Sequence, residues 1–186
     1  MKNSITRDLL IPIREISHAR TLRIPKIKYR LMNLAKPDIQ YCSTHEALPE
    51  AAEFFSWARC VGELTALEAS KASRPITVRL VDCDEMTELN SHWRHKDSAT
   101  NVLAFPFDDE AYSEQFPLGD IVICAPVVQK EADEQGKPFI DRLAHMFVHG
   151  MLHILGYDHI SSAECEEMEA LEREALSRLG YANPYE

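Results

Sequence analysis

The chain has 186 residues, of which 45% are hydrophobic and 27% are charged, a composition typical of one globular domain with a substantial core. No apolar run approaches the roughly 18 residues of a membrane span, which excludes a protein that crosses a bilayer. The five cysteines are odd in number, dispersed and never in a C-x-x-C pair. They argue against a disulfide framework or a thiolate zinc site, and for a reducing cytoplasm.

Charge is distributed unevenly around a net value of −10. Residues 1–36 contain nine Lys and Arg and two acidic residues, whereas residues 37–186 contain 11 basic and 28 acidic residues. Three interpretations of this basic extension are open: an arm that follows RNA phosphates, an Arg-rich targeting segment, and a disordered or misassigned start with Met32 as the true initiator. Residues 37–186 are expected to form a single catalytic domain.

The hydrophobic pattern predicts a mixed α/β (α+β) domain, in which a small mixed sheet packs with about five helices. A short strand at residues 39–43 precedes a helix at residues 48–70, whose apolar side chains recur at helical spacing. Alternation predicts the next strand at residues 76–81. An aspartate, Asp82 or Asp84, can cap the helix that follows.

That helix is expected to end near Trp93. Residues 102–105 and 120–124 are predicted to form two further strands, and Pro126 can begin a short helix that ends near Gly136.

A long helix is predicted at residues 139–155, and Ser161 with Glu164 forms the capping-box pattern that opens a last helix. The metal site described next lies on the long helix and on the turn after it.

Three histidines near the end of the chain, His149, His153 and His159, follow the spacing H-x-x-x-H-x-x-G-x-x-H. Residues four apart lie on the same face of a helix, so His149 and His153 can reach one ion. Gly156 tolerates the positive φ that ends a helix and turns the chain back, which brings His159 to the same ion. Three neutral imidazoles leave one tetrahedral position open to water, so the spacing predicts one catalytic Zn²⁺.

The residue after the first histidine argues against a peptidase. Metzincin metalloproteases share this spacing but have a general-base glutamate where this chain has Gly150. Glycine cannot take a proton, so the peptidase mechanism loses its general base. Hydrolysis by another mechanism stays possible, because zinc lowers the pKa of bound water to about 7 without such a glutamate. His145, one turn earlier, is expected to pack or to support a ligand, because a fourth protein ligand would close the open position.

Three blocks of the sequence resemble the motifs of a known family and occur in the same order as in that family: residues 89–106, 118–123 and 148–159. The chain resembles the YbeY family, bacterial metallo-endoribonucleases of ribosomal RNA maturation. The resemblance covers most of the chain after the basic extension. The chain departs from the family pattern at Asn101 and Ala104, where the family usually has aspartate and serine.

The resemblance implies a zinc-dependent endoribonuclease, specific for single strands, that acts in 16S ribosomal RNA 3′-end maturation and ribosome quality control. The implied catalytic residues are Arg94, His149, His153 and His159, and the three histidines hold one zinc ion. Arg94 matches the family's functional arginine, and its planar guanidinium suits a phosphoryl-transfer transition state.

The resemblance also implies partners and a place in the cell: single-stranded ribosomal RNA, the small ribosomal subunit and its assembly factors, in the cytoplasm and away from membranes. The oligomeric state is open. Two alternative functions also stay open, a zincin-like metallopeptidase and a non-catalytic ribosome-assembly factor with a structural zinc.

Several nearby residues have two interpretations each. Asp120 can hydrogen-bond a ligand imidazole or form a turn, and Asp158 can assist proton transfer or stabilise the turn that carries the third histidine. The aromatic residues Trp93, Phe105 and Phe107 could stack on unpaired bases, but we expect them in the core.

Overall fold

The computed structural model of the protein describes residues 34–107 and 116–186. These residues contain a four-stranded sheet with the strand order β1-β2-β4-β3. The first three strands in that order run parallel, and β3 pairs antiparallel with β4 at one edge. The predicted mixed α/β fold is therefore confirmed. The strands are β1 (Asp38–Tyr41), β2 (Ile76–Val81), β3 (Val102–Pro106) and β4 (Gly119–Cys124).

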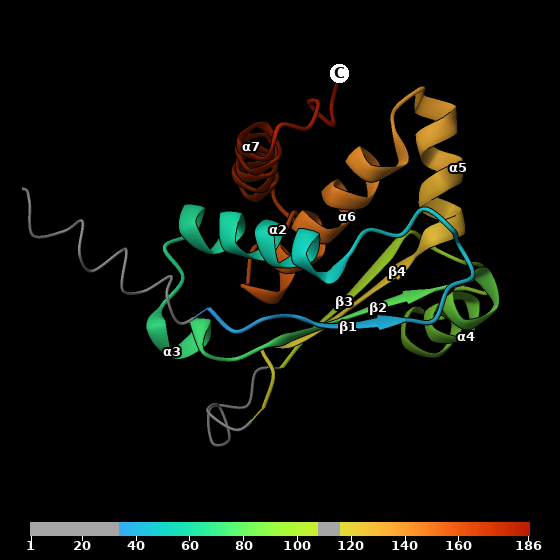
Figure 1. The fold of residues 1–186 in the computed structure, drawn as a ribbon, viewed down its shortest axis with the longest axis horizontal. Helices are drawn as coiled ribbons and strands as arrows, with labels where there is room; N and C mark the ends of the chain where they lie inside the picture. The colour runs from blue at the N-terminus through green and yellow to red at the C-terminus, as the bar shows by residue number, and fades with distance from the viewer. Residues whose placement is uncertain (1–33, 108–115) are drawn as a thin grey trace, which may run out of the picture.

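Helices cover both faces of the sheet, with α2, α6 and α7 on one side and α4 on the other (Figure 1). None of the described helices is both long enough and apolar enough to span a membrane. The helices are α2 (Ala51–Leu64), α3 (Ala69–Ala72), α4 (Cys83–Arg94), α5 (Ala125–Gln135), α6 (Phe139–Ile154) and α7 (Ser162–Leu179).

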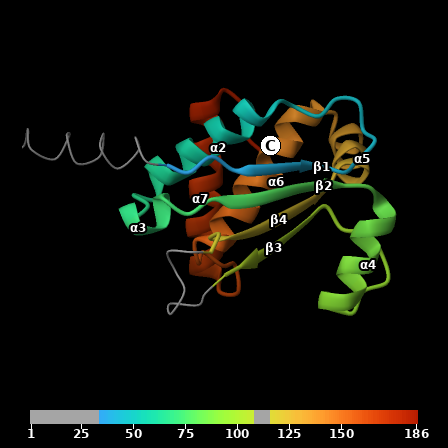
Figure 2. The same ribbon diagram turned by 60° about the horizontal axis from the view of Figure 1, so that its bottom comes forward.

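Helix α6 forms the centre of the larger core, where it packs against the sheet and against the helices α2, α5 and α7 (Figure 2). Its side chains Leu143, Phe147 and Leu152 are almost wholly buried. A helix that is apolar around most of its circumference belongs inside a protein rather than on its surface. The two histidines of α6 therefore stand on a backbone that is fixed by packing on several sides.

The helix predicted at residues 48–70 is wrong in its extent, because the chain forms two shorter helices there. Helix α2 ends at Leu64, and Ala66 then adopts a positive φ of 49°. The N–H of Leu67 donates to the carbonyl of Gly62 at 3.0 Å, which closes the helix end. Leu67 still enters the core, so the apolar spacing continues through a turn that is not helical.

Two helix starts differ in how they are capped. Ser161 forms the predicted capping box, in which its hydroxyl accepts from the N–H of Glu164 while the Glu164 carboxylate accepts from the N–H of Ser161. Asp82 stands at the N-cap of α4 but makes no cap hydrogen bond. Its carboxylate accepts from the hydroxyls of Ser43 and Thr44 instead, and so ties α4 to the segment after β1.

Most of the basic extension predicted at residues 1–36 lies outside the described residues. Its three interpretations therefore remain predictions, as does the boundary of the catalytic domain. Within the described part, the chain from Leu34 onward leads directly into β1.

Candidate metal centre

Three histidine side chains converge at the C-terminal end of α6. The Nε2 atoms of His149 and His153 lie 3.1 Å apart. One ring nitrogen of His159 joins them, so that the three ligand atoms lie within 4.8 Å of one another. Zn–N bonds of about 2.0–2.1 Å place the nitrogens of a tetrahedral site about 3.3 Å apart, close to the separation of His149 and His153. These residues could therefore hold a metal together.

The turn after α6 delivers the third histidine. Gly156 has a φ of +94°, as predicted, and the N–H of Tyr157 donates to the carbonyl of Leu152 at 3.0 Å. This pattern ends a helix and reverses the chain. The carboxylate of Asp158 then accepts from the backbone N–H of His159 at 2.8 Å. Asp158 therefore stabilises the turn, while its part in proton transfer remains a prediction.

The electrostatics of the cluster favour a neutral imidazole at His153. Burial lowers the pKa of His153, and the neighbouring His149 and His159 lower it further. A metal binds the neutral form of histidine, because a protonated ring nitrogen has no lone pair to offer. The surroundings of His153 therefore favour the neutral form of the imidazole, which is the form that can bind a metal.

Beside the histidines lies Glu172 of α7, a residue that the sequence analysis missed. It is only 1% exposed, and its carboxylate contacts His149 Nδ1 at 2.8 Å and His145 Nε2 at 3.0 Å. The hydroxyl of Tyr185 donates to the same carboxylate. Burial raises the pKa of Glu172, but these three hydrogen bonds outweigh burial and leave the pKa below its usual range.

His145 does not join the histidine cluster. Its ring centroid lies 6.5 Å from that of His149, and its two nitrogens contact Glu172 and Arg142. The residue is 7% exposed. This position fits the expected supporting or packing role.

The histidines open into a pocket of about 510 Å³ that the end of α4 and the edge strand β3 also line. Arg94, the last residue of α4, lines this pocket, as do Asn101 and Ala104. The structure thus brings Arg94 and the three histidines to one cavity, although they are far apart in the sequence. The role of Arg94 in chemistry remains a prediction.

Asn101, one of the two departures from the family pattern, makes specific contacts at the pocket wall. Its Nδ2 donates to both oxygens of Glu131, at 3.1 and 3.2 Å, and its Oδ1 accepts from the N–H of Val102 at 2.7 Å. An aspartate here would bring a second carboxylate against Glu131. The amide is therefore matched to this neighbour. Ala104 leaves the pocket wall without a hydroxyl.

One expectation about nearby residues is wrong, and another holds only in part. Asp120 is exposed, and the next residue, Ile121, packs in the core beneath α6. Successive side chains of a strand point to opposite faces, so Asp120 faces away from the histidines and cannot support them. Of the three aromatic residues expected in the core, Phe105 packs against the smaller core cluster, whereas Trp93 is 59% exposed and Phe107 is 38% exposed.

A mixed α/β domain in which a buried helix and the following turn bring three histidines to one pocket defines a class of protein with a candidate three-histidine metal site. The sequence model of the family described as Endoribonuclease YbeY matches residues 41–180. The Endoribonuclease YbeY of Stutzerimonas stutzeri (strain A1501) is 50% identical over 149 residues, which cover 80% of this chain and 89% of the relative. The chain therefore belongs to the YbeY family.

A solved structure agrees with the fold. The solution structure of TM1509 from Thermotoga maritima matches with a TM-score of 0.50 at 24% identity, and the match covers 80% of this chain and 99% of the other. At that identity the likeness supports the architecture alone. Membership of the YbeY family leaves the metallopeptidase alternative without support.

Proposed function

We propose that this chain is a zinc-dependent endoribonuclease that cuts single-stranded RNA, with 16S ribosomal RNA 3′-end maturation and ribosome quality control as its roles. The observation that carries the proposal is the convergence of three imidazoles in a pocket that Arg94 also lines. Membership of a family whose curated relative is described as an endoribonuclease supports an RNA phosphodiester as the substrate.

The site residues divide the work between metal binding and charge stabilisation. His149 and His153 would hold the ion from α6, and His159 would complete the site from the turn. Three imidazoles are a donor set that suits zinc. When bound, the ion supplies Lewis-acid chemistry that activates water near neutral pH and polarises a phosphate. Arg94 binds the phosphate through its planar guanidinium and stabilises the negative charge that develops during cleavage.

Gly150 does not oppose this chemistry. A hydrolase of this kind would need no glutamate at that position, because a bound metal would supply the activation of water that the glutamate assists in metzincins. Asp158 holds the turn of His159 and lines the same pocket. It is the carboxylate closest in sequence to the third ligand.

Local positive charge and an exposed aromatic ring favour single-stranded RNA as the substrate. The chain is acidic overall, so attraction for phosphates has to come from a local patch. The exposed residues Arg94, His95 and Lys96 form such a basic group at the end of α4. Trp93 beside them offers a ring on which an unpaired base can stack, which a base inside a duplex cannot do.

The proposed partners are unstructured ribosomal RNA, the small ribosomal subunit and its assembly factors, and the proposed compartment is the cytoplasm. Residues 37–186 form the catalytic domain in this proposal. The basic extension, residues 1–36, contributes to RNA binding only under the first of its three interpretations.

Cleavage of a fluorescently labelled unstructured RNA tests the proposal. We expect zinc-loaded protein to cut it, chelation to stop cutting, added zinc to restore it, and His153→Ala to be inactive. A perfect duplex of the same sequence should resist cleavage, and an unfolded protein such as casein should stay intact. Cutting by His153→Ala at the wild-type rate, or histidine-dependent cleavage of casein, would contradict the proposal.

A further inference from the structure

We infer that Glu172 is a positioning residue of the metal centre: it holds His149 in the tautomer whose Nε2 lone pair faces the ion, and Tyr185 of the C-terminal tail holds Glu172 in turn. The inference rests on the proposed function, because it takes His149 as a metal ligand. It adds to that function a pair of residues on α7 and the tail that bind neither metal nor substrate.

The first step is the protonation state of His145. Nη1 of Arg142 lies 2.9 Å from His145 Nδ1, and a guanidinium can only donate. Nδ1 is therefore the acceptor, and the proton of the neutral ring is on Nε2. That nitrogen lies 3.0 Å from Oε2 of Glu172, so His145 donates to the carboxylate. Glu131 fixes Arg142 from the other side through contacts of 2.8 and 2.9 Å.

The second step is the tautomer of His149. Its Nδ1 lies 2.8 Å from Oε1 of Glu172, and a carboxylate can only accept. Nδ1 therefore carries a proton, so in the neutral form, which is the form that binds a metal, the lone pair is on Nε2. That Nε2 is the nitrogen that faces His153 at 3.1 Å. A carboxylate behind a ligand imidazole fixes both its tautomer and its orientation, and increases its basicity.

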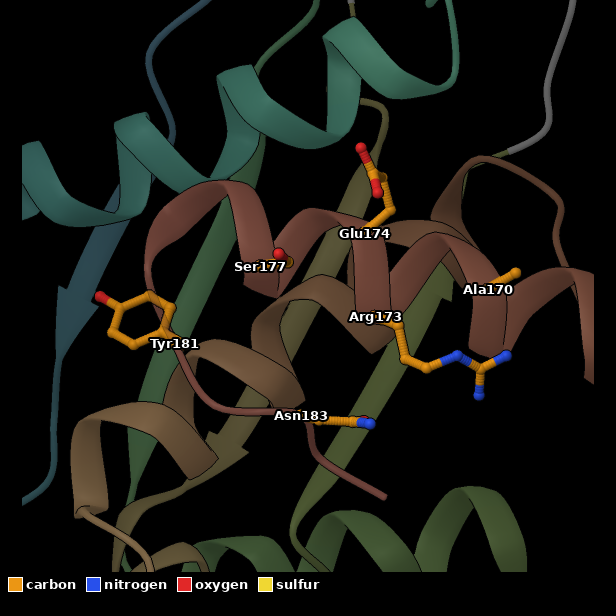
Figure 3. Close-up of a pocket in the computed structure, with 6 residues that line it drawn as sticks. All are labelled: Ala170, Arg173, Glu174, Ser177, Tyr181 and Asn183. Carbon is orange, nitrogen blue, oxygen red and sulfur yellow. The ribbon is translucent and has the colours of Figure 1, made fainter. Parts of the chain in front are cut away.

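The third step is the tail that follows α7. Figure 3 shows the chain after this helix turning back along it as far as Asn183. Nζ of Lys137 donates to the carbonyls of Asn183 at 3.1 Å and Pro184 at 2.9 Å. These bonds anchor the tail where the hydroxyl of Tyr185 donates to Oε2 of Glu172. The tail thus supplies the third donor to the carboxylate.

The three donors explain why position 172 needs a glutamate. His145, His149 and Tyr185 all donate to its two oxygens. A glutamine of nearly the same shape has one acceptor oxygen and an NH₂ group that would face a donor. If the NH₂ group faced His149, the proton of that ring would move to Nε2 and occupy the lone pair that the metal needs.

Zinc affinity, measured by competition with a chelator, tests the inference. We expect Glu172→Gln to bind zinc roughly 10- to 100-fold more weakly, the usual effect of removing such a partner. Tyr185→Phe should weaken binding about fivefold, the effect of one hydrogen bond. Glu174→Gln is the matched control, because Glu174 stands on the same helix (Figure 3). Its side chain is exposed and pairs with Arg178 instead of a histidine. The control variant should bind zinc as the wild type does.

A spectrum separates positioning from a merely structural role. With Co²⁺ in place of zinc, Glu172→Gln should change the visible ligand-field bands, since the direction of the His149 lone pair changes. A structural glutamate would lower the unfolding temperature of the metal-free protein but leave the affinity and the bands unchanged, and that result would overturn the inference. If Glu172→Gln does not fold, Tyr185→Phe decides, and wild-type affinity and bands in that variant would overturn it.

His149→Ala distinguishes failure of this inference from failure of the proposed function. If His149→Ala keeps its zinc, the ligand set itself is wrong. If His149→Ala loses zinc while Glu172→Gln and Tyr185→Phe bind it as the wild type does, the ligand set stands and only the positioning role fails.

Discussion

Gly150 of α6 lies so close to Ile121 of β4 that a β-carbon on the glycine would be 2.9 Å from Cγ2 of the isoleucine. Cγ2 of Val102 would be the next neighbour, at 3.4 Å. Both neighbours are β-branched, and such side chains are stiff at χ1 and cannot easily move aside. The absence of a side chain at position 150 therefore lets the histidine-bearing helix approach the sheet. The position where metzincins have a catalytic glutamate serves packing in this chain.

We predict that Gly150→Ala lowers stability, even though alanine favours a helix by about 1 kcal/mol over glycine. Overpacking costs about 1–3 kcal/mol and should outweigh that gain. Gly150→Glu should be less stable still and should gain no activity on casein. Thermal unfolding of the metal-free variants measures the effect. An alanine variant as stable as the wild type would contradict the packing role.

Loss of either helical ligand should remove the metal. In His149→Ala and His153→Ala we expect zinc and RNA cleavage to disappear together, because two imidazoles hold the ion much less tightly than three. Some stability should be lost as well, since metal binding is coupled to folding. Metal analysis of the purified proteins is the measurement, and His92→Ala, an exposed histidine of α4, is the control. Full zinc occupancy in both ligand variants would refute the assignment.

Substitution of Arg94 should affect turnover but not zinc binding, unlike substitution of the three histidines. We predict that Arg94→Ala keeps its fold and zinc but loses roughly 10²- to 10³-fold in turnover, the scale of one charge-stabilising group. Arg94→Lys should recover only part of the rate, because a point charge does not reproduce the planar fork. Single-turnover cleavage and metal content should be measured on the same samples. A parallel loss of zinc would show that the roles are assigned wrongly.

The histidine cluster could be predicted from the sequence because its geometry is local. His149 and His153 are one helical turn apart, and Gly156 marks the reversal that brings back His159. Helical periodicity and the conformational freedom of glycine are enough to place such residues together. The strand at residues 76–81 could be found for the same reason, because alternation is a property of neighbouring residues.

Glu172 could not be predicted in the same way, because its contacts cross from α7 to α6 and to the tail. One signal was present: Glu172 lies four residues after Met168 and three before Ala175, on the buried stripe of α7. A carboxylate on a buried stripe needs partners, and partners mark a site. The early end of α2 gave no such signal, because Ala66 is an ordinary helix former that here adopts a positive φ.

The basic extension can be tested by its effect on salt dependence. If residues 1–36 are an RNA arm, a protein that begins at Met32 should bind single-stranded RNA more weakly and with a flatter dependence on salt, because each lost phosphate contact lowers the slope by roughly 0.7. Affinities of both forms across a salt series measure this. Equal slopes would rule out the arm. Cleavage should survive in either case, since the residues assigned to chemistry lie between Arg94 and His159.

The surrounding structure fixes the three proposed ligands to different degrees, and this difference would affect how a metal is exchanged. His149 and His153 belong to a helix packed on several sides, whereas the side chain of His159 is 53% exposed on the turn before α7. The conformational entropy lost on binding therefore falls mainly on that turn. The two imidazoles of α6 would therefore already be in place for an ion, whereas the ordering of the turn would set how long all three ligands hold it.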